Sequence, residues 1–369
     1  MTRFQQVKGN FQLLISLILF VIPRIVYGEN ASLVPLQETE FMPKQTGLLV
    51  TWVQPESQAR EVGLRIGDIL FSYRNTPITD ISSLVEAVGA SAAKSEESIK
   101  LQFARRDERL DVSVKPGKLG IQGTAVEKGK VLLLRPPPSG HSFDWSKLDH
   151  APVDRWYKFM FGDEGQVGFD HVAFRKEGEI VHFTNSYGYD SKNYGRGYAT
   201  IQIQFRVDKG LTILSFEGNN SYIQSHTKGQ RDADKNEFVT VVTTEKGTNT
   251  TRVPILAGFL PGNLATHITG FVPQVEKLSI HYIHFDEFIG NYGNPAAFVT
   301  GEKAQLTVDG KSINVYRVDN FAIGERSPLG WVASDGTVYK EDFNGAYNVL
   351  STKDEVLANM PASLRTFVH

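Results

Sequence analysis

Beyond Pro138 the chain alternates apolar and polar residues in short runs that are separated by glycine-containing turns. The run ATIQIQFRV covers residues 199–207, and LTILSFEG follows it after an Asp-Lys-Gly turn. The pattern recurs in FVTVVTTEKGTNTTRVPIL, AQLTVDGKSINVYRVDNF and GWVASDGTVYKEDF. Alternation with a period of two predicts strands that bury one face, and runs joined by such turns predict antiparallel hairpins. We therefore expect a large antiparallel β-sheet domain over residues 150–369.

Helical patterns are sparse in this region. The clearest runs from Thr352 to Met360, where Thr352 can cap the first turn and Glu355 follows at the capping-box spacing. The fold class that the sequence predicts is therefore mainly β with minor α.

The first residues have the pattern of a secretory signal. Arg3 and Lys8 precede an apolar run at 13–22, and Val26 and Gly28 are small residues at the cleavage positions. We expect residues 1–28 to be a signal peptide, with an uncleaved anchor as the alternative, although the run is shorter than the ~20 residues of a spanning helix. The protein is then expected to be exported, periplasmic or secreted at a bacterial cell envelope, with no stable membrane span after cleavage.

Composition excludes some classes of function. The chain has 39 Lys and Arg against 41 Asp and Glu, a net charge of −2, so no basic surface for nucleic acid is expected. It has no cysteine, which excludes disulfides, thiolate metal sites and cysteine nucleophiles.

Residues 47–118 combine strand, turn and helix signals in a specific order. The strand candidate GLLVTWV is followed by a short helical turn, QAREVGL, and a tight turn at Gly67-Asp68 leads into ILFSY. The next helix candidate is DISSLVEAVGA, in which Asp80 is a good N-cap and apolar residues recur at helical spacing. IKLQFARRDERLDVSVKPG then closes the unit as a hairpin.

This order of elements, with Gly-Leu-x-x-Gly-Asp between the first helix and the second strand, resembles a PDZ domain of the bacterial type. The resemblance covers Gly47 to Lys118 and implies a small β-barrel or sandwich with two helices, which we expect over residues 29–120. PDZ domains bind an extended peptide, usually a free C-terminus, as an added strand between an edge strand and a helix. The resemblance therefore implies a protein or C-terminal peptide as the partner. Residues 121–149, which contain RPPPSG, are expected to form a linker.

The resemblance also suggests where the peptide binds. Leu84 and Val88 are the expected groove wall on the helix, with Ser83 or Ala87 as the alternative if the helix is rotated. In bacterial PDZ domains the carboxylate-binding loop has an apolar-Gly-apolar pattern and precedes an edge strand upstream of the segment matched by Gly47. The corresponding place here is NASLVPLQETEF, so the expected peptide-binding residues are Ser32, Leu33 and Val34. This segment lacks the glycine, and TGLL at 46–49 is the alternative loop.

No catalytic pattern accompanies these elements. The chain has no His-Glu-x-x-His and no serine in a glycine-flanked nucleophile turn, and SDG at 334–336 has the wrong order for an aspartic protease. His281 and His284 precede two acidic residues, but their apolar neighbours favour a strand, where a separation of three puts the rings on opposite faces. We expect no enzymatic activity, no cofactor and no metal, with an undetected hydrolase as a further alternative.

Two segments of the β domain resemble a second group of proteins. DRWYKFMFGDEGQVGFDHVAF, and later VDGKSINVYRVDN with GWVASDGTVYKEDF, are similar to exported β proteins of uncharacterised function whose curved sheet is like that of lipid-carrier half-barrels. The main hypothesis is an exported, non-enzymatic protein that binds a peptide or protein partner through its PDZ module. The alternative is a carrier of a lipid or other hydrophobic ligand in the β domain, docked to a receptor by the PDZ module.

Overall fold

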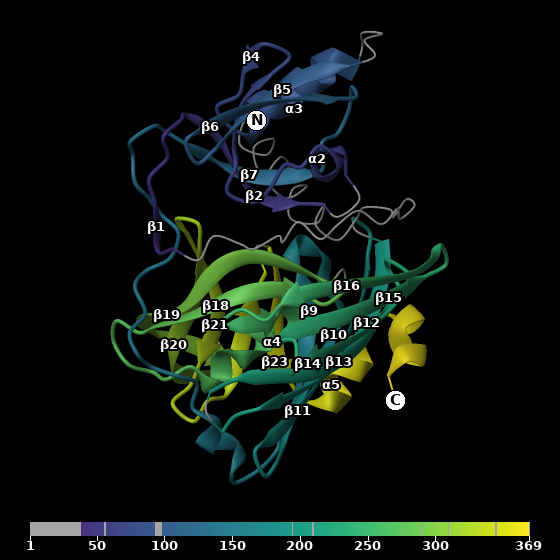
Figure 1. Cartoon of the computed structure of the whole chain (residues 1–369). Helices are drawn as coiled ribbons and strands as arrows, with labels where there is room; N and C mark the ends of the chain where they lie inside the picture. Colours follow the sequence, from purple (N-terminus) through teal and green to yellow (C-terminus); the bar gives the residue numbers. More distant parts are fainter. Residues whose placement is uncertain are drawn as a thin grey trace, which may run out of the picture.

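The computed structural model describes residues 38–54, 57–92, 98–193, 195–208, 210–288, 290–308, 310–343 and 345–368. The expected signal peptide and Ser32, Leu33 and Val34 lie outside these residues. The described chain is mainly β with few helices, as the sequence predicts, and its two main sheets lie one above the other in Figure 1. No helix among the described residues is long and apolar enough to cross a membrane.

The smaller sheet has six strands, and two helices accompany it. Its elements are β2 (Gly47–Val53), α2 (Gln58–Glu61), β3 (Ile69–Tyr73), β4 (Thr76–Pro77), α3 (Ile81–Ala92), β5 (Ile99–Arg105), β6 (Glu108–Val114) and β7 (Ile121–Val126). The strand order is β6-β5-β3-β2-β7, with β4 paired to β3. Residues 121–126, which the sequence assigned to the linker, form β7 and pair antiparallel with β2.

Both helices pack on one face of this sheet. Leu84 on α3 lies in a buried cluster with Leu48, Leu64 and Phe103. The start of α3 is capped as predicted, because Asp80 Oδ1 accepts from Ser83 N at 2.7 Å and Ser83 Oγ accepts from Asp80 N at 3.1 Å. The opposite face buries a smaller cluster centred on Leu49 and Ile69.

The turn before β3 depends on a buried ion pair. Asp68 is 1% exposed and accepts from Arg65 N and from Arg105 Nε and Nη2, each at 2.8 Å. Arg105 Nη2 also donates to the carbonyl of Gly63 at 2.6 Å, and Gly63 has a φ of +78°. The Gly-Leu-x-x-Gly-Asp segment is therefore a turn fastened to β5 through Asp68 and Arg105.

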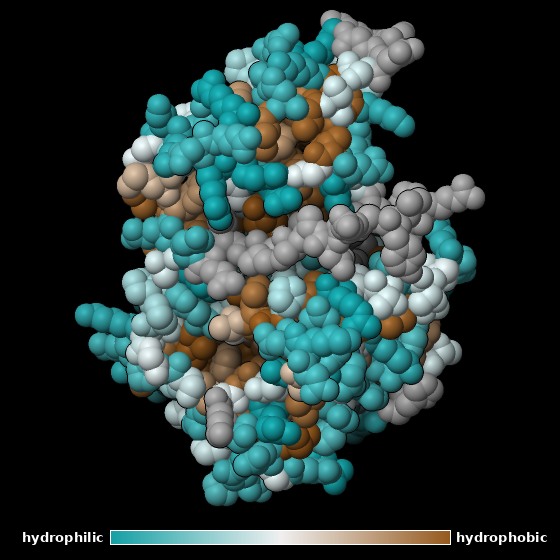
Figure 2. Space-filling model, in the orientation of Figure 1, coloured by the Kyte–Doolittle hydropathy of each residue, from teal (hydrophilic) through white to brown (hydrophobic). Residues whose placement is uncertain are grey.

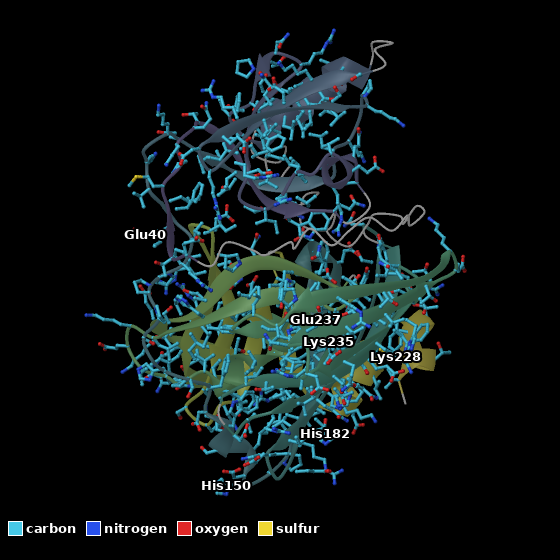
Figure 3. The ribbon with its side chains drawn as sticks, in the orientation of Figure 1. Glu40, His150, His182, Lys228, Lys235 and Glu237 are labelled. Carbon is cyan, nitrogen blue, oxygen red and sulfur yellow. The ribbon has the colours of Figure 1, made fainter. Side chains whose placement is uncertain are left out.

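A two-stranded ribbon and an extended segment connect the two main sheets. The ribbon pairs β1 (Glu40–Phe41) with β8 (Leu132–Leu133), and Glu40 in Figure 3 marks its place between the sheets. Beyond it, Leu134 O accepts from Ile323 N at 2.7 Å, and Ser139 N donates to Ser279 O at 3.0 Å. The segment 134–139 is therefore attached along the larger sheet.

The larger sheet has fifteen strands in one continuous order, β16-β15-β14-β13-β12-β11-β10-β9-β23-β22-β21-β20-β19-β18-β17. Every pair is antiparallel except β17 with β18. The strands are β9 (Val153–Phe161), β10 (Gly165–Glu177), β11 (Ile180–Ser191), β12 (Gly195–Arg206), β13 (Thr212–Asn220), β14 (Ser225–Asp232), β15 (Glu237–Thr244), β16 (Gly247–Pro254), β17 (Phe259–Pro261), β18 (Ser279–Asp286), β19 (Asn291–Val308), β20 (Lys311–Ala322), β21 (Glu325–Val332), β22 (Val338–Asp342) and β23 (Ala346–Ser351). The hairpins that the alternating runs predict are confirmed.

The larger sheet curls until its two ends face each other. Phe238 on β15 lies 5.0 Å from Phe259 on β17, measured between ring centroids. The helix α4 (Gly262–His267) and the turn η3 (Ile268–Phe271) lie within the curl, where Leu264 is fully buried. Two short 3₁₀ turns, η1 (Trp145–Leu148) and η2 (Gly162–Glu164), precede β9 and β10.

The C-terminal helix α5 (Lys353–Asn359) and the turn η4 (Ala362–Phe367) pack outside the curl, where Val356 and Leu364 bury Phe169 of β10. Thr352 caps α5 as predicted, because its side chain accepts from Glu355 N.

Candidate functional site

The free edge of β7 is the candidate site for a partner. Among the described residues β7 ends the six-stranded sheet. Gln54 N donates to Gly120 O at 2.8 Å, so the backbone groups of the next residue, Ile121, face away from β2. Val50 bonds through both its N–H and its C=O to the β3 side, and it stands opposite Gly123. The backbone groups of Gly123, and by alternation those of Ala125, therefore also face the free edge.

The loop before β7 is held against α2 by hydrogen bonds of its backbone N–H and C=O groups. The Gln58 side chain accepts from Lys115 N at 2.8 Å and donates to Lys118 O at 2.9 Å. Ala59 N donates to Leu119 O at 3.1 Å, and Leu119 is only 3% exposed. These bonds fix where β7 begins.

Gly120 is required at the turn into β7. Its φ is +78°, and a Cβ at this position would lie 2.4 Å from Ser57 Cβ. Ser57 caps α2 through its hydroxyl, so it cannot give way without loss of the cap. Only glycine satisfies both conditions.

Replacement of Gly120 by alanine is therefore expected to destabilise the protein by at least about 2 kcal/mol, from backbone strain plus the clash. Gly63→Ala is the matched control, because Gly63 has the same φ of +78° but nothing within 4 Å of its Cβ position. Chemical denaturation of both variants gives the comparison. Equal losses for the two variants would show that the contact with Ser57 does not matter.

The helix α3 lies beside β7 and supplies apolar side chains. Leu84 is 4% exposed in the core, while Val88 and Ile121 are partly buried at the border of the same cluster. Figure 2 shows hydrophobic surface on this unit between the levels of α3 and β7. Val85, by contrast, is 63% exposed outside this cluster. Within the described chain, the arrangement offers a strand edge that pairs with no other strand and lies next to an apolar wall.

The predicted helix positions lie here, whereas the predicted strand at Ser32, Leu33 and Val34 lies outside the described residues. Leu84 is buried in the cluster beneath the apolar surface of α3, and Val88 lies partly buried at the border of that cluster. Of the alternatives, Ser83 is engaged in the cap and Ala87 is buried.

Among the described residues, the edge strand beside α3 is β7, which follows the final hairpin. TGLL at 46–49 leads into β2, whose edges are taken by β3 and β7, so it cannot serve as the loop before an edge strand. The missed signal is Leu119-Gly120-Ile121, which has the apolar-Gly-apolar pattern.

The histidines considered from the sequence do not come together. His281 on β18 bonds to the Pro136 carbonyl, whereas His284 on the same strand lies against Gly262 and Gly293. Burial lowers the pKa of both. His150 and His182 lie at the end of the larger sheet that is remote from the six-stranded sheet (Figure 3).

A different group of side chains could hold a metal ion. Asp170, His267 and Glu341 each offer one ligand atom within 4.8 Å of the others, and all three are buried. Burial raises the pKa of Asp170. Burial alone would lower the pKa of His267, but the Glu341 and Asp170 carboxylates raise it to about 9. These residues are far apart in the sequence, and no local motif marks them.

Comparisons with known proteins give limited similarity. No family model matches the chain. Over 82 residues the chain is 33% identical to a protein of Synechocystis sp. described as "Putative serine protease HhoA"; the match covers 21% of this chain and 20% of that protein. The chain thus spans about a fifth of that relative's length. A β-barrel-like protein of a domain of unknown function from Brucella abortus has a TM-score of 0.35 and 14% identity, covering 55% of this chain and 96% of that one.

Proposed function

We propose that this protein is an exported, non-enzymatic binding protein that takes up the C-terminal segment of a partner protein as an added strand along β7. The observation that carries the proposal is the edge of β7, which pairs with no other strand in the described part of the chain. This edge lies between the Gly120 turn and the apolar wall of α3. The sequence resemblance to PDZ domains supports it. The exported location rests on the signal pattern of residues 1–28.

The geometry suggests how the peptide would lie. It pairs with the outward backbone groups of Ile121, Gly123 and Ala125, and its C-terminus lies near Gly120. Its last side chain packs on Val88 and Ile121, over Leu84. Main-chain hydrogen bonds then supply affinity, and the apolar wall favours a hydrophobic final residue.

The lipid-carrier alternative has weaker support. An acyl chain would need room within the curled sheet, on the side where α4 and η3 lie. There, Phe271 packs 4.9 Å from Phe174 and 4.7 Å from Trp145, and Phe238 is fully buried against Phe259. These aromatic contacts favour a packed interior, and the peptide-binding proposal is therefore preferred.

Two matched valines on α3 test the proposal. A display screen of C-terminal peptides against the full chain identifies a ligand, and its affinity is then measured by titration calorimetry. Val88→Ser is expected to weaken binding about tenfold, because it removes part of an apolar contact worth ~1.5 kcal/mol or more. Val85→Ser changes an exposed valine on the same helix and is expected to leave affinity unchanged.

Ala125→Pro tests the strand edge itself. Ala125 is exposed and its N–H faces outward, so proline removes no bond of the β2–β7 ladder but blocks pairing with a peptide. We expect at least a tenfold loss of affinity with little change in melting temperature. A peptide that binds all three variants as tightly as the unchanged protein would contradict the proposal.

A further inference from the structure

The interior of the larger sheet contains a row of polar side chains on five adjacent strands. Asn185 lies on β11, Asp170 on β10, Tyr157 on β9, Asn348 on β23 and Glu341 on β22. Each of them is at most 5% exposed. The alternation of β10 places Asp170 on the same face as Val172 and Phe174, in the apolar core.

The last residue of α4, His267, meets this row from the concave side. Its Nδ1 lies 3.1 Å from both oxygens of Glu341, and its Nε2 lies 3.6 Å from Asp170 Oδ2. Asn348 Nδ2 donates to Asp170 Oδ2 at 2.7 Å and to Glu341 Oε2 at 2.9 Å. Three potential ligands from three separate elements thus converge at one buried point.

The two asparagines add a second, independent observation. Asn185 Oδ1 and Asn348 Oδ1 are buried and have no hydrogen-bond partner among the described residues, although the amide nitrogens of the same groups point into the cluster. A buried acceptor without a donor is costly. Rotation of either amide by a half turn would bring its oxygen toward the carboxylates. Two oxygens in contact repel each other unless a cation lies between them.

The chemistry of the cluster also suits a cation. Two carboxyl groups face one imidazole in an apolar core, where uncompensated charge is costly. Arg155 is a basic side chain that also acts on His267, and its Nη2 donates to the carbonyl of Gly336 at 2.8 Å.

We propose that Asp170, His267 and Glu341 bind one divalent transition-metal ion of the Mn²⁺ to Zn²⁺ series, with the Asn185 and Asn348 amide oxygens completing the ligand set. Imidazole nitrogen together with carboxylate and amide oxygens suits such an ion, and the cysteine-free chain offers no thiolate. The burial of all the ligands makes the site structural. The ion would fasten α4 to β10 and β22.

The test uses the full chain. The protein is unfolded in denaturant that contains a chelator, and the denaturant and the chelator are then removed. It is refolded with Zn²⁺, with Mn²⁺ or without metal. Elemental analysis is expected to find about one equivalent of metal, and the melting temperature is expected to rise by about 5 °C or more at saturating metal. Refolding with Co²⁺ should give the visible absorption of a cobalt ion held by nitrogen and oxygen ligands.

Glu341→Gln and Asp170→Asn preserve side-chain shape and are expected to abolish the metal content and the thermal shift. Glu287→Gln is the matched control, because Glu287 is equally buried but caps the other end of α4 through Gly262 N and Asn263 N. If either cluster variant fails to fold, the Co²⁺ spectrum of the unchanged protein still shows whether the site binds metal. Absence of metal, of thermal shift and of cobalt absorption in that protein would overturn the proposal, as would full retention of metal by Glu341→Gln.

Discussion

Substitution of Arg105 by alanine is expected to lower the free energy of unfolding by about 3 kcal/mol, because it leaves the carboxylate of Asp68 buried without its cation. Arg105 holds Asp68 with two hydrogen bonds and also bonds to the Gly63 carbonyl, and its side chain is 28% exposed. The hydrogen bonds with Asp68 raise the pKa of Arg105 itself. Urea denaturation measures the loss.

The matched control for this prediction lies on the same strand. Lys100 pairs with Asp111 on the surface at 2.7 Å, and both side chains are about half exposed. Exposed ion pairs contribute little, so Lys100→Ala should leave stability almost unchanged. The explanation fails if the two variants lose the same amount. It also fails if Arg105→Ala combined with Asp68→Asn is no more stable than Arg105→Ala alone.

Substitution of His267 is expected to destabilise the protein as much as Arg105→Ala does, or more. In metal-free protein, His267→Ala should lower the free energy of unfolding by about 3–5 kcal/mol, because Asp170 and Glu341 lose the cationic ring between them. Both carboxylates are at most 5% exposed, so bulk water does not screen them. Chemical denaturation in the presence of a chelator is the measurement.

A second substitution separates charge from lost volume. Adding Glu341→Gln to His267→Ala should recover part of the stability if charge is the cause, but would recover nothing if the cost came only from a cavity. His226→Ala is the control, since His226 is a partly exposed histidine 3.4 Å from Glu217 on the sheet surface. A loss for His267→Ala no larger than that for His226→Ala would contradict the expected effect.

Local signals predicted the elements of this fold, whereas one long-range pairing escaped them. Period-two alternation predicted the hairpins of the larger sheet, and Asp80 and Thr352 marked the helix starts, because each of these features depends on neighbours in the sequence. β7 was missed because IQGTAV has a central glycine and little apolar alternation. Its place is set by pairing with β2, a strand more than sixty residues earlier.

The polar cluster was missed for a related reason. Alternation within VGFDHVAF does place Asp170 on the face shared with Val172 and Phe174, but a single acidic residue in a strand does not reveal what it meets. Its partners Glu341 and His267 come from other strands and from a short helix. Only the curl of the sheet brings the three together.

The fastening of segment 134–139 has a mechanical consequence. Because Leu134 bonds to Ile323 and Ser139 bonds to Ser279, the proline-rich stretch adds no loose hinge between the two sheets. The proline-rich stretch and the larger sheet are then expected to tumble in solution with one rotational correlation time. A pulling force on a peptide bound along β7 would reach the larger sheet through the segment 134–139.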